Sequence, residues 1–120
     1  MMETAATLFG LAALGGLLMA GMRLSGKPHP PAWLAMGHGF LAAAGLTLLI
    51  YAACAVGIAP MAEVAVGLLV IAAAGGAAMN LLFHWKQRPL PIALMLGHAA
   101  LAVTGFALLL LSLARSADAA

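Results

Sequence analysis

Two histidines, His38 and His98, are the residues of this chain best suited to chemistry. Each lies inside a long apolar stretch, directly after a glycine, in the dipeptides Gly37-His38 and Gly97-His98. An ionisable side chain in such a stretch is costly and therefore needs a purpose. A neutral imidazole can bind a transition metal or hold a hydrogen bond across a helix interface. The sequence therefore predicts two equivalent histidines with a shared role inside the protein.

The chain repeats itself at an offset of sixty residues, without a gap. The matching positions include acidic residues, glycines, prolines and the two Gly-His dipeptides. They pair Glu3 with Glu63, Gly15-Gly16 with Gly75-Gly76, Met19 with Met79, Pro31 with Pro91, and Gly45 with Gly105. Such self-similarity indicates an internal duplication, with residues 1–60 and 61–120 as the two copies.

The composition indicates an integral membrane protein, because 66% of the residues are hydrophobic and only 7% are charged. Lipid cannot satisfy free backbone groups, so the apolar stretches must be helices. Four stretches are long enough to cross a hydrocarbon core of about 30 Å: Thr4–Leu24, Ala32–Ile58, Met61–Phe83 and Leu90–Ala114. We therefore expect an all-α fold, an integral membrane four-helix bundle built as a tandem duplication of a two-helix transmembrane hairpin.

The charges outside the spans predict an orientation. The links 23–30 and 84–90 are basic, whereas the turn 57–60 has no lysine or arginine. The positive-inside rule then places both basic links in the cytoplasm and both termini outside, in a bacterial-type inner membrane. The net charge of +2 serves this topology and gives no indication of a nucleic-acid partner.

The polar residues outside the spans are expected to be solvated. His29 and His84 belong to the two basic links, so we expect both at the membrane boundary and in contact with water. The C-terminal residues 115–120 are expected to fray, as chain ends commonly do.

Two glycine pairs, Gly15-Gly16 and Gly75-Gly76, lie at the depth predicted for the histidines. At about 1.5 Å per residue, glycines and histidines both fall roughly 10–12 Å below the basic face. An up-down-up-down bundle places the first and third helices on one diagonal and the second and fourth on the other. One level of the bundle would thus hold two imidazoles and two nearly bare helix surfaces, which a backbone or a flat ligand can approach.

Glycine on the first and third helices and histidine on the second and fourth resembles the haem-binding bundles of membrane b-type cytochromes. The resemblance implies one haem b with His38 and His98 as iron ligands and the glycine pairs at the porphyrin edge. It implies electron transfer with a quinone or a partner redox subunit. The two-haem members would need second ligands thirteen or fourteen residues further on, where this chain has Tyr51, Ala52, Leu111 and Ser112. At most one haem fits, in the cytoplasmic half.

A second interpretation needs no cofactor. The histidines would then hydrogen-bond across helix interfaces in an accessory or scaffold subunit of a larger membrane complex. Both interpretations make the lipid bilayer and another membrane protein, or a second copy, the expected partners. An electron carrier or accessory subunit is favoured over a stand-alone enzyme, because no Ser-His-acid set or intramembrane acidic pair is present. Glu3 and Glu63, at helix starts, also argue against a small multidrug exporter.

Overall fold

The computed structural model describes residues 1–120 and is all-α, as predicted. It contains four long helices, of which the second and third each end in a π-helical turn. The elements are α1 (Met2–Leu24), α2 (Ala32–Tyr51), η1 (Ala52–Val56), α3 (Pro60–Met79), η2 (Asn80–His84) and α4 (Ile92–Asp118).

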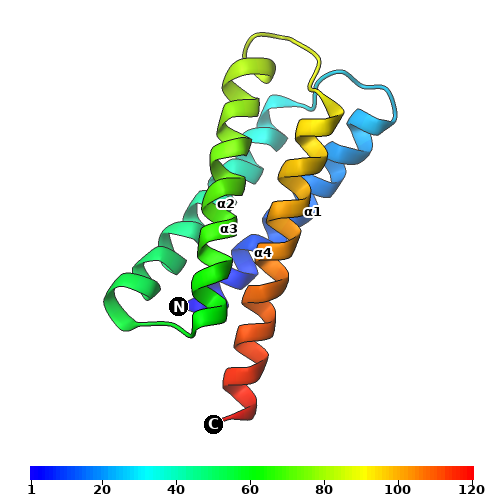
Figure 1. The fold of residues 1–120 in the computed structure, drawn as a ribbon. Coiled ribbons are helices and arrows are strands. Elements are labelled where there is room, and N and C mark those ends of the chain that lie inside the picture. Colours follow the sequence, from blue (N-terminus) through cyan, green and yellow to red (C-terminus); the bar gives the residue numbers. More distant parts are fainter.

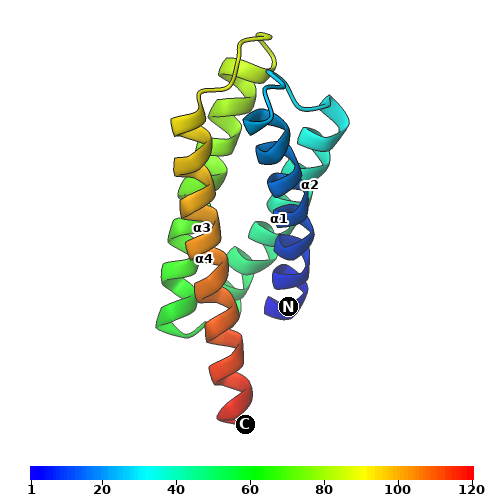
Figure 2. The ribbon, with the colours of Figure 1, turned by 90° about the vertical axis from the view of Figure 1, so that its right-hand side faces the viewer.

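The helices run alternately up and down, so the connections gather at two ends. The two longer links, between α1 and α2 and between η2 and α4, lie at the same end (Figure 1). This basic end also carries both lysines and two of the three arginines. The short turn between η1 and α3 lies at the opposite end with both chain termini, and α4 projects beyond the other helices there in both views (Figures 1 and 2).

The helices pair as two hairpins. α1 packs mainly on α2 and α3 mainly on α4, while α1 also contacts α4 and α2 contacts α3. The diagonal pairs are therefore α1 with α3 and α2 with α4. At the basic end, the Nε of Arg23 donates a hydrogen bond of 2.9 Å to the carbonyl oxygen of Leu90, which joins the two hairpins.

Prolines, and residues in the left-handed (αL) backbone conformation, determine several helix boundaries. Pro31 and Pro91 directly precede α2 and α4, and Pro60 is the first residue of α3, where a missing N–H costs nothing. After α1 the chain turns through Gly26, with φ of 93°, and after η2 through Gln87, with φ of 52°.

The closest packing lies in the half of the bundle near the termini. Its fully buried members include Ala5, Leu49, Ala65 and Leu109. A Cβ built on Gly105 would lie 2.9 Å from the Leu69 Cγ, so this position requires glycine for α3 and α4 to approach. The small residues that the repeat shares thus bring helices together at this level.

The outside of the bundle is apolar. Large side chains such as Leu17, Phe40 and Val103 are more than 60% exposed. All four helices are long and apolar enough to cross a membrane, counting η1 with α2 and η2 with α3. Lipid is the solvent that such a surface suits, because exposing apolar side chains to water is unfavourable.

The prediction that residues 115–120 fray is wrong for most of that segment. α4 continues to Asp118, and the Ser116 hydroxyl donates a hydrogen bond of 2.9 Å to the carbonyl oxygen of Ser112. No glycine or proline interrupts the last turns of α4, and alanine and arginine are strong helix formers.

Candidate functional site

His38 links the two helices of the first hairpin. It lies six residues after Ala32, the start of α2, or about 9 Å along the helix. Its ring nitrogen Nδ1 is 2.7 Å from the carbonyl oxygen of Ala12 on α1. The half-buried ring is therefore fixed at one edge by a backbone atom of its own hairpin.

His98 makes the same connection in the second hairpin. Its Nδ1 lies 2.8 Å from the carbonyl oxygen of Ala72 on α3. Both donor and acceptor stand sixty residues after their counterparts, His38 and Ala12. The two hairpins thus position their histidines in the same way.

These hydrogen bonds determine which tautomer a neutral imidazole adopts. A carbonyl oxygen only accepts, so the proton belongs on Nδ1 in both His38 and His98. The second nitrogen, Nε2, then carries a lone pair. Metal-binding histidines commonly show this arrangement, because the Nδ1–H bond orients the ring and raises its basicity as a ligand.

The two imidazoles meet between the hairpins. Their ring centroids are 6.2 Å apart and their planes are inclined by 73°. A metal ion bound by two imidazoles on opposite sides, with bonds of about 2 Å, separates the ring centroids by about 6 Å. The separation of the His38 and His98 rings is therefore of the size that two imidazole ligands of one ion would show.

Gly16 and Gly76 have a more specific role than a general small surface. A Cβ added to Gly16 would lie 3.1 Å from the Cε1 of His38, and one added to Gly76 would lie 3.1 Å from the Cε1 of His98. Each glycine thus makes room for the imidazole of its own hairpin. Of their neighbours, Gly15 is in ordinary contact distance of His38, whereas nothing lies within 4 Å of a Cβ on Gly75.

The side chains available as ligands limit which kind of metal centre this site could hold. The structure contains no cluster of three or more His, Cys, Asp and Glu side chains that could hold a metal ion. A structural zinc site takes four protein ligands, whereas a haem iron takes only one or two because the porphyrin supplies the others. Two neutral imidazoles in an apolar bundle therefore fit a b-type haem in the chemistry of the donors.

A second pair of imidazoles lies at the basic end. The ring centroids of His29 and His84 are 6.4 Å apart and their planes are inclined by 78°. The prediction that both are solvated is wrong for His84, whose Nδ1 is buried without a hydrogen-bond partner. His84 is the last residue of η2, and the i→i+5 bonding of that turn, seen from Trp85 N to Asn80 O, redirects its side chain.

Nothing in the sequence marks Ala12 and Ala72 as the carbonyl partners of the histidines. Ala12 and Ala72 match across the sixty-residue offset, but alanine is too frequent in this chain to mark a site. Only the rotation of each hairpin about its axis decides which carbonyl an imidazole reaches.

No protein-family model, curated protein or solved structure matches this chain.

Proposed function

We propose that this chain is a small integral membrane protein that holds one b-type haem between α2 and α4 and transfers electrons. One observation carries the proposal: two imidazoles from separate hairpins lie 6.2 Å apart, each with Nδ1 on a backbone carbonyl. In this tautomer both Nε2 atoms keep a lone pair for the iron. His38 and His98 would be the axial ligands.

Each part of the site has a task in this proposal. The carbonyls of Ala12 and Ala72 orient the imidazoles, and Gly16 and Gly76 let the rings approach. The apolar side chains around them keep water away, which influences the reduction potential of a bound iron. When bound, a haem supplies reversible one-electron transfer.

The shape of the molecule indicates which class of partner the proposed electron carrier would have. The helices account for nearly all of residues 1–120, and their outer faces carry exposed apolar side chains. A quinone within the bilayer, or a redox subunit in the same membrane, is the partner class that fits. We place the protein in a bacterial-type inner membrane, with the basic links in the cytoplasm and both termini outside.

The hydrogen bonds also favour a second candidate function. The imidazoles of His38 and His98 each tie two helices together without any cofactor, which is what an accessory subunit of a membrane complex requires. In double-mutant studies of membrane helices, such bonds contribute about 0.6 kcal/mol on average. The two candidates are therefore distinguished by cofactor binding rather than by stability.

The deciding experiment is absorption spectroscopy of the purified protein. The full chain is produced with a haem precursor, purified in mild detergent and examined oxidised and after dithionite reduction. We expect the sharp reduced bands of a six-coordinate b-type haem. His38→Ala and His98→Ala should each abolish that spectrum, because each removes one axial ligand.

His29→Ala is the matched control, since it removes an imidazole at the basic end and leaves both proposed ligands in place. It should retain the six-coordinate spectrum. Circular dichroism of His38→Ala should show a helical protein destabilised by about 1 kcal/mol, the contribution of one hydrogen bond. A folded, colourless wild-type protein would overturn the haem proposal and favour the accessory subunit.

A further inference from the structure

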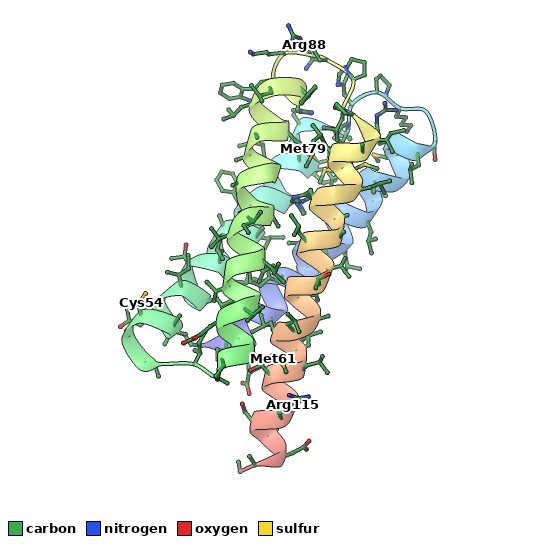
Figure 3. All side chains as sticks on the ribbon, in the orientation of Figure 1. Cys54, Met61, Met79, Arg88 and Arg115 are labelled. Carbon is green, nitrogen blue, oxygen red and sulfur yellow. The ribbon has the colours of Figure 1, made fainter.

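A groove lined by apolar residues together with two serines and an arginine lies at the end of the bundle opposite the basic links, between the start of α3 and the end of α4. Its volume is about 510 Å³. Pro60 and Met61 line it from α3, and Ser112, Arg115 and Ser116 line it from α4. Figure 3 shows the labelled Met61 and Arg115 at this end. The groove is far from the histidines and takes no part in the proposed electron transfer.

Ser112 is the unusual residue of this groove. It is only 3% exposed, and its hydroxyl is buried without a hydrogen-bond partner. Its backbone carbonyl already accepts a hydrogen bond from the Ser116 hydroxyl. A buried hydroxyl left without a partner destabilises a protein, so its presence indicates a group that is supplied from outside the chain.

The other hairpin provides an internal comparison. Sixty residues earlier, Ser112 is matched by Ala52, which is also 3% exposed, so packing at this position does not need the hydroxyl. In the same way, Arg115 is matched by Ala55, and Ser116 by Val56.

The matching end of the first hairpin has its own groove of about 400 Å³. It is lined by Glu3, Ala52 and Val56 among others, and no arginine is present. The hydroxyls and the guanidinium therefore belong to one groove only, and the helix geometry of the repeat does not require them.

The charges favour an anion in the α3–α4 groove. Arg115 contributes a permanent positive charge with several N–H donors. The first turn of α3 adds the partial positive charge of a helix N-terminus, although Pro60 has no N–H and the N–H groups of Ala62 and Glu63 already donate to the carbonyl oxygen of Ala59. Two carboxylates are nearby: Glu63 in the first turn of α3 and Asp118, three residues after Arg115 on α4. Both are exposed, and neither lines the groove.

The surroundings distinguish a lipid from a free anion. Leu110 and Leu111, next to Ser112, are 45% and 50% exposed, and they continue an apolar surface along α4 away from the groove. A phospholipid can place its phosphate beside Arg115 and its acyl chains against such a surface. A free phosphate would use only the polar half of this arrangement.

We infer that the groove between α3 and α4 binds the phosphodiester of an anionic phospholipid. Arg115 pairs with the phosphate, and the Ser112 hydroxyl donates a hydrogen bond to it or to the adjacent ester oxygen. This inference is independent of haem binding, because it concerns the opposite end of the bundle.

Native mass spectrometry of the detergent-purified full chain, titrated with phosphatidylglycerol, tests the inference. We expect the first phosphatidylglycerol molecule to bind more tightly than any further phosphatidylglycerol molecules. Arg115→Gln should weaken that binding about tenfold or more, because a hydrogen bond to a charged group contributes about 1.5–3 kcal/mol. Ser112→Ala should weaken it about two- to tenfold, and it should fold normally because Ala52 occupies the matching position.

Arg88→Gln is the matched control, because it removes the same charge from the exposed basic end. It should leave the affinity of the first lipid unchanged. Equal binding by wild type and Arg115→Gln, or an equal loss in Arg88→Gln, would overturn the inference. Glycerol 3-phosphate should not displace the lipid at millimolar concentration, and displacement would show that the groove recognises a free phosphate ester instead.

Discussion

An imidazole inside an apolar bundle must find partners for its polar atoms within the protein. His38 and His98 each satisfy one ring nitrogen with a carbonyl that is already part of a helix. Such a carbonyl has a second lone pair, so the imidazole N–H can share it without breaking the helix. The histidine is thereby oriented at little cost, and its other nitrogen remains free for a second contact.

The glycine that faces each ring can be tested at the residue scale. Gly76→Ala should destabilise the protein by about 1 kcal/mol, because its methyl group forces the His98 ring to move against its hydrogen bond. Gly75→Ala is the adjacent control and has nothing within 4 Å of its new methyl group. It should be neutral or stabilising by up to about 1 kcal/mol, since alanine favours helix.

Thermal unfolding in detergent, followed by circular dichroism, measures both variants. The role assigned to Gly76 would be wrong if the two substitutions changed the midpoint equally. Gly16→Ala, at the matching position in the first hairpin, should behave like Gly76→Ala.

Sequence reasoning located the histidines and glycines but misjudged part of what they contact. The shared depth of His38 and Gly16 followed from counting residues along helices, and the structure brings these two residues together. The partner carbonyl of Ala12 could not be predicted, because it depends on how far each helix is rotated. The burial of the His84 Nδ1 atom was also missed, because this half-buried residue ends a π turn, which carries no clear sequence signature.

At the scale of elements, the first and third helices differ mainly in how they end. After α1, the N–H groups of Gly26 and Lys27 bond back to Arg23 and Met22, the pattern of a Schellman motif with glycine in the αL position. After η2, the N–H groups of Gln87 and Arg88 bond back in the same pattern to His84 and Phe83.

The second motif comes one residue later relative to the repeat, and it places glutamine where the first has glycine. The i→i+5 bonding of η2 takes up one more residue than an α turn, which accounts for the shift.

Gln87→Gly should therefore stabilise the protein by about 1 kcal/mol, because an αL residue with a Cβ costs about 1–2 kcal/mol. The exposed hydrogen bond from Gln87 Nε2 to the His84 carbonyl oxygen, at 3.0 Å, offsets only part of this gain. Gln87→Ala keeps the Cβ and loses that hydrogen bond, so it should be the least stable of the three proteins. Denaturant titrations of the three proteins provide the order, and a lower stability for Gln87→Gly than for Gln87→Ala would contradict this account.

At the scale of the whole molecule, tight packing and the candidate site occupy different halves. The cluster around Leu49 and Leu109 lies near the termini, whereas the imidazoles lie toward the basic end. The apolar exterior means that water does not drive the hairpins together within lipid, so close packing and polar contacts carry the association. The end with the site depends on fewer packed side chains and more on hydrogen bonds such as that from Arg23 to Leu90.

The four spans and their pairing were predictable from the sequence. Hydropathy and length determine which segments can cross lipid, and short links force neighbours to be antiparallel. The extension of α4 to Asp118 was not predicted, because the hydropathy pattern stops at the last apolar residue and the helix does not.

Separating the hairpins tests how self-contained they are. Residues 1–58 and 59–120, produced together as two chains, should co-purify, because α1 contacts α4, α2 contacts α3, and Arg23 bonds to the Leu90 carbonyl oxygen across the two hairpins. With an affinity tag on one fragment only, the purified pair should bind haem in the absorption assay described above. Each fragment alone should not bind haem. Failure of the untagged fragment to co-purify would show that the turn between the hairpins is essential to assembly.

The turn at residues 57–59 also has a consequence for how such a centre could originate. Each hairpin carries half of the imidazole pair, so a protein with a single hairpin would need two copies to meet in the membrane. The present chain contains both halves, and the short turn keeps their local concentration high and independent of expression level. With the halves joined, each can change separately, and the contrast between Ser112 and Ala52 is one such difference: only the groove of the second hairpin is lined by serines and an arginine.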